Sequence, residues 1–207
     1  MIKRFLLLTL LVFSFTACDK KDKQEAKEEQ EAVLKSDPLS QFSMKFINSS
    51  QILFMKKTKE GIEFASEEQE GKALLFFFFT PDCTPCKAVF SHMNNLQKKY
   101  KDRASVIGVM IEGTISLPKK QAKDEEPERV ELKQRALSRD EAMDFINKNQ
   151  LQFLVSNNEG ANFFAKILGI KKLPHFALYD IDAKLINEYQ GLVYEEMLDI
   201  DMQKALR

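Results

Sequence analysis

The chain has 207 residues, with 31 basic and 31 acidic side chains, 17 phenylalanines, three cysteines and no tryptophan. This length is enough for one domain of ordinary size with a real hydrophobic core. Because the charges balance, the chain has no basic excess that would attract nucleic acid. The sequence has no internal repeat and one C-x-x-C motif. We therefore expect a single folded domain whose partners are not nucleic acids.

The N-terminus has the pattern of a secretory signal. The basic segment MIKR precedes Phe5–Ala17, which carries no charge. That run is too short to span a bilayer as a mature helix, but it fits the apolar core of a signal peptide over residues 1–17. It ends in FTAC, which resembles the bacterial lipobox, in which Cys18 becomes the first mature residue and carries lipid. Phe15 departs from the leucine that is usual there, and ordinary signal cleavage or an uncleaved anchor are the alternatives.

A tether is predicted between the lipidated cysteine and the folded domain. The segment Asp19–Ser36 is almost entirely charged or polar and cannot bury a core. We therefore divide the mature chain into a linker at 18–37 and a domain at 38–207. The tether would let the domain stand off the membrane on its periplasmic or extracytoplasmic face.

The domain begins with strands. A hairpin is expected within Gln51–Ser66, with its turn at TKEG. Lys72–Thr80 is a continuous apolar run, which predicts a central strand buried on both faces. A helix follows over 86–100, and Ala104–Gly113 is a second candidate for a buried strand.

The C-terminal half alternates strands and helices. The segment of about 114–137 is charged and holds two prolines, which predicts an insertion that either borders the active site or is a solvated excursion. Ser138 and Glu141 form a capping box that opens a helix to about Asn149. The remaining predictions are a strand at 151–155, a helix at 159–169, paired strands at 175–180 and 183–190, and a helix at 194–206. This alternation predicts an α/β fold with a partly parallel sheet.

The two cysteines of CTPCK, Cys83 and Cys86, lie between the apolar strand and the helix. A C-x-x-C motif can be a redox couple, half of a metal site or a structural staple. Closing so short a loop would stabilise the fold by only about 2 kcal/mol on a chain-entropy estimate, which disfavours the staple. Two cysteines with His175 could bind copper(I) or zinc, so a thiol-based copper chaperone is the alternative function.

The order of elements, CTPCK and KKLPHFALYD together resemble the thioredoxin fold. More narrowly, they resemble the membrane-anchored TlpA/ResA type of thiol–disulfide oxidoreductase, over roughly three quarters of the chain. The resemblance implies a three-layer α/β sandwich whose central mixed sheet is flanked by helices, with one charged insertion. It also implies a catalytic Cys83–Cys86 disulfide facing a cis Pro174, which leaves the backbone of Leu173 free to pair with an extended substrate.

The resemblance further implies exchange with the disulfides or thiols of substrate proteins, without a cofactor or metal. Only a thiolate attacks a disulfide, so we expect Cys83 to be exposed and electrostatically favoured. The helix N-terminus and Lys87 favour the thiolate, whereas Asp82 disfavours it. Pro85 suits the first helical turn, and Thr84 is placed with it at the substrate edge. A modestly stabilised thiolate predicts a reductase with a membrane electron donor, for which cytochrome c maturation is one possible use.

The chain departs from the family pattern near the cysteines. Asp82 replaces the usual aromatic residue, and Phe77 stands where thioredoxin has a buried acid. Val89 stands where ResA-type members have a glutamate, and His175 where threonine often follows the proline. The family's proton-transfer roles therefore do not carry over, and Glu112 is the substitute candidate. We expect His175 either to tune the thiols or to be a partly exposed strand residue.

Overall fold

The computed structural model describes residues 41–118, 129–134, 137–157 and 159–207, with side chains described outside the segment 113–136. The predicted signal peptide, Cys18 and the linker lie outside the described residues, as does the middle of the insertion. No helix in the described ranges is both long and apolar enough to cross a membrane. Residues Gln41–Arg207 form a compact unit.

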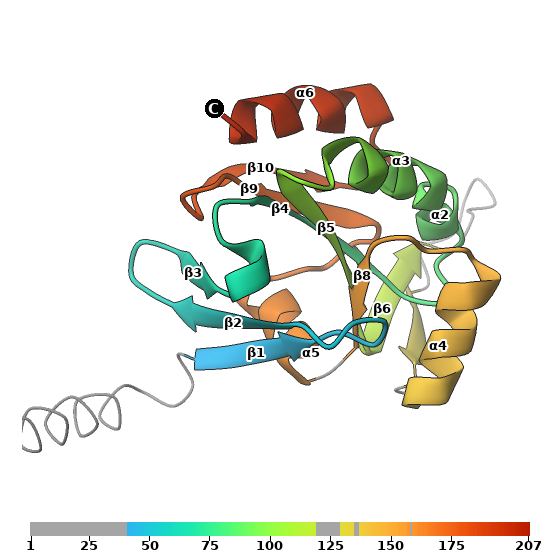
Figure 1. Cartoon of the computed structure of the whole chain (residues 1–207). Coiled ribbons are helices and arrows are strands. Elements are labelled where there is room, and N and C mark those ends of the chain that lie inside the picture. Colours follow the sequence, from blue (N-terminus) through green and yellow to red (C-terminus); the bar gives the residue numbers. More distant parts are fainter. Residues whose placement is uncertain (1–40, 119–128, 135–136, 158) are drawn as a thin grey trace, which may run out of the picture. The chain divides into compact units, whose positions relative to one another are not determined.

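The described unit contains ten strands, five α-helices and one short 3-10 helix (Figure 1). The strands are β1 (Gln41–Lys45), β2 (Ile52–Lys57), β3 (Ile62–Ala65), β4 (Ala73–Phe79), β5 (Ala104–Met110), β6 (Gly113–Pro118), β7 (Arg129–Gln134), β8 (Leu154–Ser156), β9 (His175–Tyr179) and β10 (Leu185–Gln190). The helices are α2 (Thr84–Lys87), α3 (Phe90–Tyr100), α4 (Arg139–Lys148), α5 (Glu159–Ile167) and α6 (Glu195–Ala205), and the 3-10 helix is Glu67–Gln69.

A mixed five-stranded sheet forms the centre of the unit, in the order β10-β9-β4-β5-β8. β4 is parallel to β5, and β5 to β8, whereas β9 is antiparallel to both β4 and β10. Every residue of β4 and β5 is buried. A strand covered on both faces needs an apolar side chain at every position, which is why the run in β4 is continuous and not alternating. The predicted mixed central sheet is confirmed.

The two faces of this sheet pack against different layers. Phe77 and Phe79 contribute to a core shared with α3, α4 and α6. Phe76 and Phe78 contribute to a second core shared with α5 and the sheet β1–β3. Figure 1 shows α3 and α6 on one side of the sheet, and α5 and β1–β3 on the other. The predicted three-layer arrangement therefore follows from the period-two alternation of side chains along β4.

The turn between β1 and β2 covers the edge strand β8. The Ile47 N–H donates to the carbonyl of Val155 at 2.7 Å. The Asn48 amide donates to the carbonyl of Phe153 at 2.8 Å, and its oxygen accepts the Val155 N–H at 3.0 Å. These bonds occupy backbone groups that would otherwise be open at the edge. The strand β8 begins later than predicted, because the Leu151 N–H bonds back to the carbonyl of Ile146 at 3.1 Å at the end of α4.

The start and end of the insertion form a hairpin that the sequence did not predict. β6 and β7 pair antiparallel, with Gly113 opposite Gln134 and Pro118 opposite Arg129. The hairpin begins three residues after the end of β5. Charged residues and prolines dominate the sequence of the insertion, and its few β-branched residues are a weak local signal for strands.

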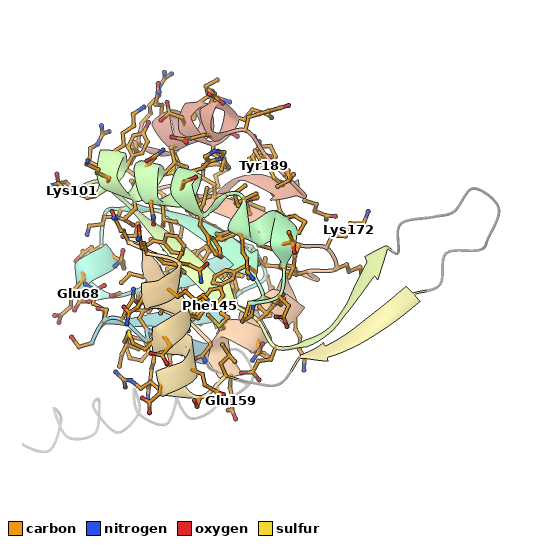
Figure 2. All side chains as sticks on the ribbon, turned by 90° about the vertical axis from the view of Figure 1, so that its right-hand side faces the viewer. Glu68, Lys101, Phe145, Glu159, Lys172 and Tyr189 are labelled. Carbon is orange, nitrogen blue, oxygen red and sulfur yellow. A yellow bond between two sulfur atoms is a disulfide. The ribbon has the colours of Figure 1, made fainter. Side chains whose placement is uncertain are left out.

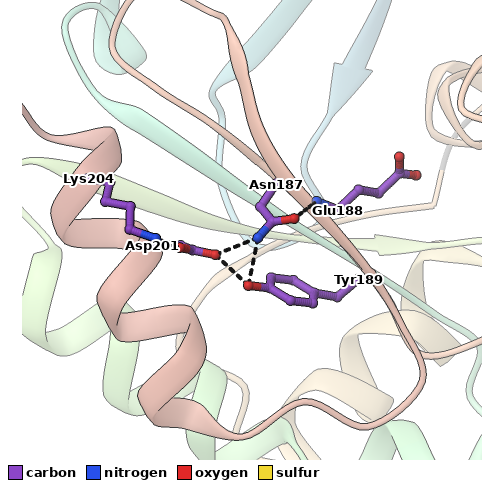
Figure 3. Close-up of polar contacts among 5 residues, drawn as sticks. All are labelled: Asn187, Glu188, Tyr189, Asp201 and Lys204. Atoms are coloured by element: carbon purple, nitrogen blue, oxygen red, sulfur yellow. Dashed lines mark hydrogen bonds and ion pairs between the residues drawn. The ribbon is translucent and has the colours of Figure 1, made fainter.

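A buried polar cluster joins β10 to α6 (Figure 3). Asp201 is 3% exposed and accepts hydrogen bonds from Asn187 at 2.8 Å, from the Tyr189 hydroxyl and from Lys204 at 2.7 Å. Burial alone would raise the pKa of Asp201, but the bonds from Lys204, Tyr189 and Asn187 outweigh it and hold the pKa below its usual value. Burial and the bond to Asp201 raise the pKa of Tyr189 to about 12. The cluster thus holds an ionised aspartate and anchors α6 on the sheet.

Candidate active site

One edge of the central sheet brings the candidate residues together. In the parallel pair β4–β5, Phe79 lies opposite Met110, so both strands end at this edge. In the antiparallel pair β4–β9, Phe78 lies opposite His175, so β9 begins there. The cysteine segment after β4, Glu112 after β5 and Pro174 before β9 therefore all lie at the same edge, as is usual for sites in sheets of this kind.

Cys83 and Cys86 form a disulfide whose Cα atoms are 5.2 Å apart. Cys83 is the N-cap of α2, and its sulfur accepts the backbone N–H of Cys86 at 3.2 Å. The Cys83 N–H donates to the carbonyl of Thr80 at 3.1 Å, which closes the turn out of β4. Pro85 lies in the first turn of α2, where a residue without an N–H loses no helical bond. The amide at the start of α2 thus points at the sulfur that would carry a thiolate.

Both cysteines are buried in this oxidised form. Cys83 is 3% exposed and Cys86 is fully covered, and both belong to the core that contains Phe77 and Phe79. The expectation that Cys83 is exposed is therefore wrong for this state, because the sulfurs pack against the apolar end of β4. The exposed residues around them are Asp82, Thr84, Pro85 and Lys87. A partner must approach closely between these side chains to reach the disulfide.

Pro174 is buried and follows a cis peptide bond from Leu173. Its carbonyl accepts the Gly191 N–H at 2.8 Å, which ties the loop after β10 to this segment. Within the described part of the chain, the backbone N–H and C=O of Leu173 make no hydrogen bond. Figure 2 looks onto this side of the domain and shows the neighbouring Lys172 pointing outward. An extended chain could pair with the open backbone of Leu173.

The structure corrects the expectation for His175. The residue is 1% exposed and lies opposite Phe78, with its ring 5.7 Å from the Phe78 ring. Paired strand residues share a face, so His175 points into the core opposite to the one that contains the cysteines. It therefore neither contacts the thiols nor is partly exposed. The sequence pattern missed this because facing depends on strand register, which only the paired sheet defines.

His175 is instead half of a polar pair. Its Nε2 lies 2.6 Å from the Glu188 carboxylate, and its buried Nδ1 has no partner in the described part of the chain. Burial lowers the pKa of His175, although Glu188 opposes that shift. The described residues contain no group of three His, Cys, Asp or Glu side chains that could hold a metal ion. A site made of the two cysteines and His175 is thus disfavoured by the direction of the imidazole.

Glu112 lies at the same edge of the sheet as the cysteines, and hydrogen bonds of its backbone and of the preceding residue fix its position. Its N–H donates to the side-chain oxygen of Asn162 at 2.8 Å, and the preceding Ile111 N–H donates to the carbonyl of Phe79 at 3.0 Å. The half-buried side chain of Glu112 therefore lies just after β5, whose last residue is paired with the last residue of β4. Its acid–base role stays a prediction.

Comparison with known proteins agrees with this geometry. Residues 62–206 match the family model described as a thioredoxin-like domain. The chain belongs to the thioredoxin-like family. Over 151 residues it is 27% identical to the thiol–disulfide oxidoreductase ResA of Bacillus thuringiensis, a match that covers 73% of each protein.

Solved structures support the same fold for this thioredoxin-like domain. A thiol:disulfide interchange protein of the thioredoxin family from Chlorobium tepidum superposes with a TM-score of 0.54 at 16% identity, covering 81% of this chain and 94% of that one. The DsbF protein of MTB, whose structure holds mixed oxidised and reduced forms, gives 0.52 at 15% identity, covering 81% and 96%. The predicted thioredoxin fold and the similarity to ResA are confirmed. Together with the close cysteine pair, they identify the chain as a thiol–disulfide oxidoreductase.

Two partners of the predicted site residues were missed by the sequence interpretation. The loop that begins at Gly191 is bonded to Pro174, and Glu188 partners His175. The sequence GLVY at 191–194 was a possible signal for this loop, because it places a leucine and a tyrosine directly after a predicted strand, where a solvated turn usually has polar residues. Glu188 carried no such signal, because its partner is 13 residues away in the sequence.

Proposed function

We propose that this protein is an extracytoplasmic, membrane-anchored reductase of protein disulfides. The observation that carries the proposal is the Cys83–Cys86 disulfide at the start of α2, at the same sheet edge as cis-Pro174. In this assignment Cys83, Cys86 and Pro174 form the reactive centre. Asp82, Thr84, Pro85, Lys87, Leu173 and Glu112 border it and tune or orient the exchange.

The reaction is a two-electron exchange between dithiol and disulfide. The Cys83 thiolate attacks one sulfur of the substrate disulfide, forms a mixed disulfide and releases the other substrate sulfur as a thiolate, which takes up a proton. The Cys86 thiolate then attacks the Cys83 sulfur, restores the internal disulfide and releases the second substrate thiol. Two electrons and two protons pass to the substrate. Cys86, which is fully buried next to Cys83, is suited to this second attack from within.

The surroundings of Cys83 support a reductase. One backbone N–H, that of Cys86, bonds to the Cys83 sulfur. Lys87 adds a positive charge one helical turn away, whereas Asp82 adds a negative charge directly before the cysteine. These opposing charges leave the thiolate only modestly stabilised, so the reduced form gives up its electrons readily. A measured potential near −120 mV, that of the strong oxidant DsbA, would contradict this assignment.

The membrane attachment rests on the N-terminal sequence. The apolar run Phe5–Ala17 and the small residues before Cys18 support export followed by lipidation. A lipid on Cys18 and the charged linker would hold the domain at the periplasmic or extracytoplasmic face. Because that compartment is oxidising, an electron donor in the membrane must return electrons to the pair.

Insulin reduction by the full-length protein, combined with thiol trapping and metal analysis, tests the proposal. Wild-type protein should turn over with a thiol reductant, and Cys83→Ser should abolish turnover. Cys86→Ser should instead accumulate mixed disulfides on Cys83, because the resolving attack is missing. Tightly held stoichiometric metal without turnover would refute the reductase in favour of the copper chaperone.

A further inference from the structure

The hairpin β6–β7 leaves the domain at the edge of the central sheet where the cysteines lie. β5 ends at Met110, opposite the last residue of β4, and β6 begins at Gly113. Figure 2 shows the hairpin, in pale yellow-green and yellow, extending away from the rest of the described unit. A two-stranded sheet is only marginally stable by itself in water, and it usually needs a third strand or a packed helix. The hairpin is therefore a place where a partner can add a strand.

The edges of the described sheets differ in how well they are protected from another strand. The edge strand β8 is covered by the turn between β1 and β2, and β10 has a shift in its pairing between Leu185 and Asn187. β6 ends in Pro118, which has no N–H to donate. β7 has six residues without proline, glycine or a shift in its pairing, and among the described strands it pairs with β6 alone. Since prolines and irregular pairing protect an edge, β7 is the open edge of the hairpin.

The register of β6 and β7 gives the hairpin two chemically different faces. Residues that are opposite each other in neighbouring strands share a face, and so do alternate residues of one strand. One face is aliphatic and consists of Ile115, Leu117, Val130 and Leu132. The other face is polar, with all its charges in β7, and includes Thr114, Ser116, Arg129, Glu131 and Lys133. A strand that pairs with β7 must match both its aliphatic face and its alternation of base, acid and base.

A second copy of β7 matches both faces in an antiparallel register. A slip of one residue would bring the aliphatic face of one copy beside the charged face of the other. Centring the pair on Glu131 would place Glu131 opposite itself and Arg129 opposite Lys133, so that every pair has like charges. Centring it on Leu132 instead places each Glu131 opposite the partner's Lys133. Opposite charges across paired strands stabilise them, and like charges destabilise them.

The extent of pairing also favours the register centred on Leu132. Centring the pair on Val130 would place Arg129 opposite the partner's Glu131, but it would pair only 129–131 of each strand. The register centred on Leu132 pairs 130–134, with the leucine opposite its own copy on the aliphatic face. It therefore combines the longer ladder with two pairs of opposite charge.

We propose that β7 pairs antiparallel with β7 of a second copy of this chain, with Glu131 opposite the partner's Lys133, to form a four-stranded sheet. The contact uses the same strand of both copies, as a two-fold dimer requires. The shared sheet has one aliphatic and one charged face, and it meets the need of the hairpin for further strands. The inference goes beyond the proposed function, because the pairing does not depend on any thiol exchange. Because each hairpin begins at the sheet edge of the cysteines, the two copies are joined on that side of each domain.

The proposed interface is small, and its size sets the expected affinity. A contact made by one strand of each copy lies at the low end of the range for specific interfaces, where association is weak and transient. We expect a dissociation constant of roughly 10 µM to 1 mM. The measurement must therefore cover that range of protein concentration.

Sedimentation equilibrium of the full-length protein, in excess detergent whose density is matched by the buffer, measures the association. The wild type should show an equilibrium between monomer and dimer. Glu131→Lys should raise the dissociation constant about tenfold, because both charge pairs across the interface then have like charges, and Lys133→Glu should do the same. Within the hairpin Glu131 lies opposite Ser116 and Lys133 opposite Thr114, so neither reversal creates a pair of like charges there.

Mixing the two variants separates strand pairing from a general effect of charge. In an equimolar mixture of Glu131→Lys and Lys133→Glu, a mixed dimer again has opposite charges at both positions. The mixture should consequently associate with a constant within about threefold of the wild-type value. The matched control Glu63→Lys reverses an exposed charge in another strand, β3, and should keep the wild-type constant.

Three results would overturn the inference. They are a wild type that stays monomeric up to about 1 mM, single variants that associate as tightly as the wild type, and a mixture that associates no more tightly than its components. A monomeric wild type would leave the open edge of β7 to a strand of another protein. Insulin reduction separates these results from the proposed function, since a wild type without turnover would overturn the reductase and leave the sedimentation result unaffected.

Discussion

The two faces of the central sheet bury ionisable groups in different ways. On the cysteine face, Asp201 has three hydrogen-bonding side chains and its pKa lies below the usual value. On the opposite face, His175 has Glu188 as a partner, and burial lowers the pKa of the imidazole. The first arrangement holds a fixed charge, whereas the second loses its preferred neutral state when the pH falls. The difference shows that satisfaction of a buried group, and not burial alone, decides its charge.

The largest expected effect on stability is on the cysteine face of the sheet, where Asp201 accepts hydrogen bonds from three side chains. Asp201→Ala would leave the Tyr189 hydroxyl without its acceptor and would remove one of the two acceptors of the Asn187 amide. It should lower the free energy of unfolding by about 3 kcal/mol in urea titrations. The matched variant Asp199→Ala removes a more exposed partner of Lys99 and should cost clearly less. Because the pKa of Asp201 is lowered on folding, its contribution is present above pH of about 4 and is lost as the pH falls through the folded value. Equal losses in the two variants would contradict this role.

The second largest effect on stability is expected at Gly108, which packs closely against aromatic rings on the cysteine face. A Cβ on Gly108 would lie 2.7 Å from the Phe153 ring and 3.0 Å from the Phe79 ring. Gly108→Ala should therefore cost roughly 1–3 kcal/mol in unfolding free energy through overpacking. The same substitution in a Phe153→Leu background should cost less, because the smaller side chain makes room. Equal costs in both backgrounds would show that Phe153 is not the obstacle.

The opposite face should make stability depend on pH. The folded pKa of His175 lies below its ordinary value of about 6.5, so the unfolded chain binds the extra proton first as the pH falls. Stability should consequently be greatest above pH 6.5 and decline below it, by at most about 1.4 kcal/mol per pH unit, until the folded value is reached. His175→Gln should remove this slope in urea titrations between pH 7 and pH 5. Glu188→Gln removes the stabilising carboxylate and should make the slope extend further into acid.

The smallest expected effect concerns the rim of the reactive centre, where exposed charges replace buried ones. Asp82→Asn removes a carboxylate that disfavours the Cys83 thiolate, so the reduced form is stabilised and the reduction potential rises. We expect a rise of about 10–30 mV in glutathione redox titrations, since 30 mV corresponds to about 1.4 kcal/mol. Lys87→Gln should shift the potential in the opposite direction. Shifts of the same sign would show that charge is not the cause.

Much of the fold could be predicted because its signals are local. The unbroken apolar run of β4, the capping box of α4 and the turn at Gly169 after α5 are each encoded within a few residues. β1 and the hairpin β6–β7 were not predicted, since short strands are stabilised mainly by their partners and carry weak patterns of their own. The edge of the sheet at which the cysteines lie also followed from chain order, because consecutive parallel strands end at a common edge.

The sequence by itself determined the residues that we propose for the chemistry: a C-x-x-C pair at a strand-to-helix turn and a proline before a later strand. Only the tertiary structure decided how these groups are presented. It covers Cys83 in the oxidised form, turns His175 away from the sulfurs and ties Gly191 to Pro174. The physical reason is that exposure and facing depend on strand register and helix pairing, which join residues far apart in the chain.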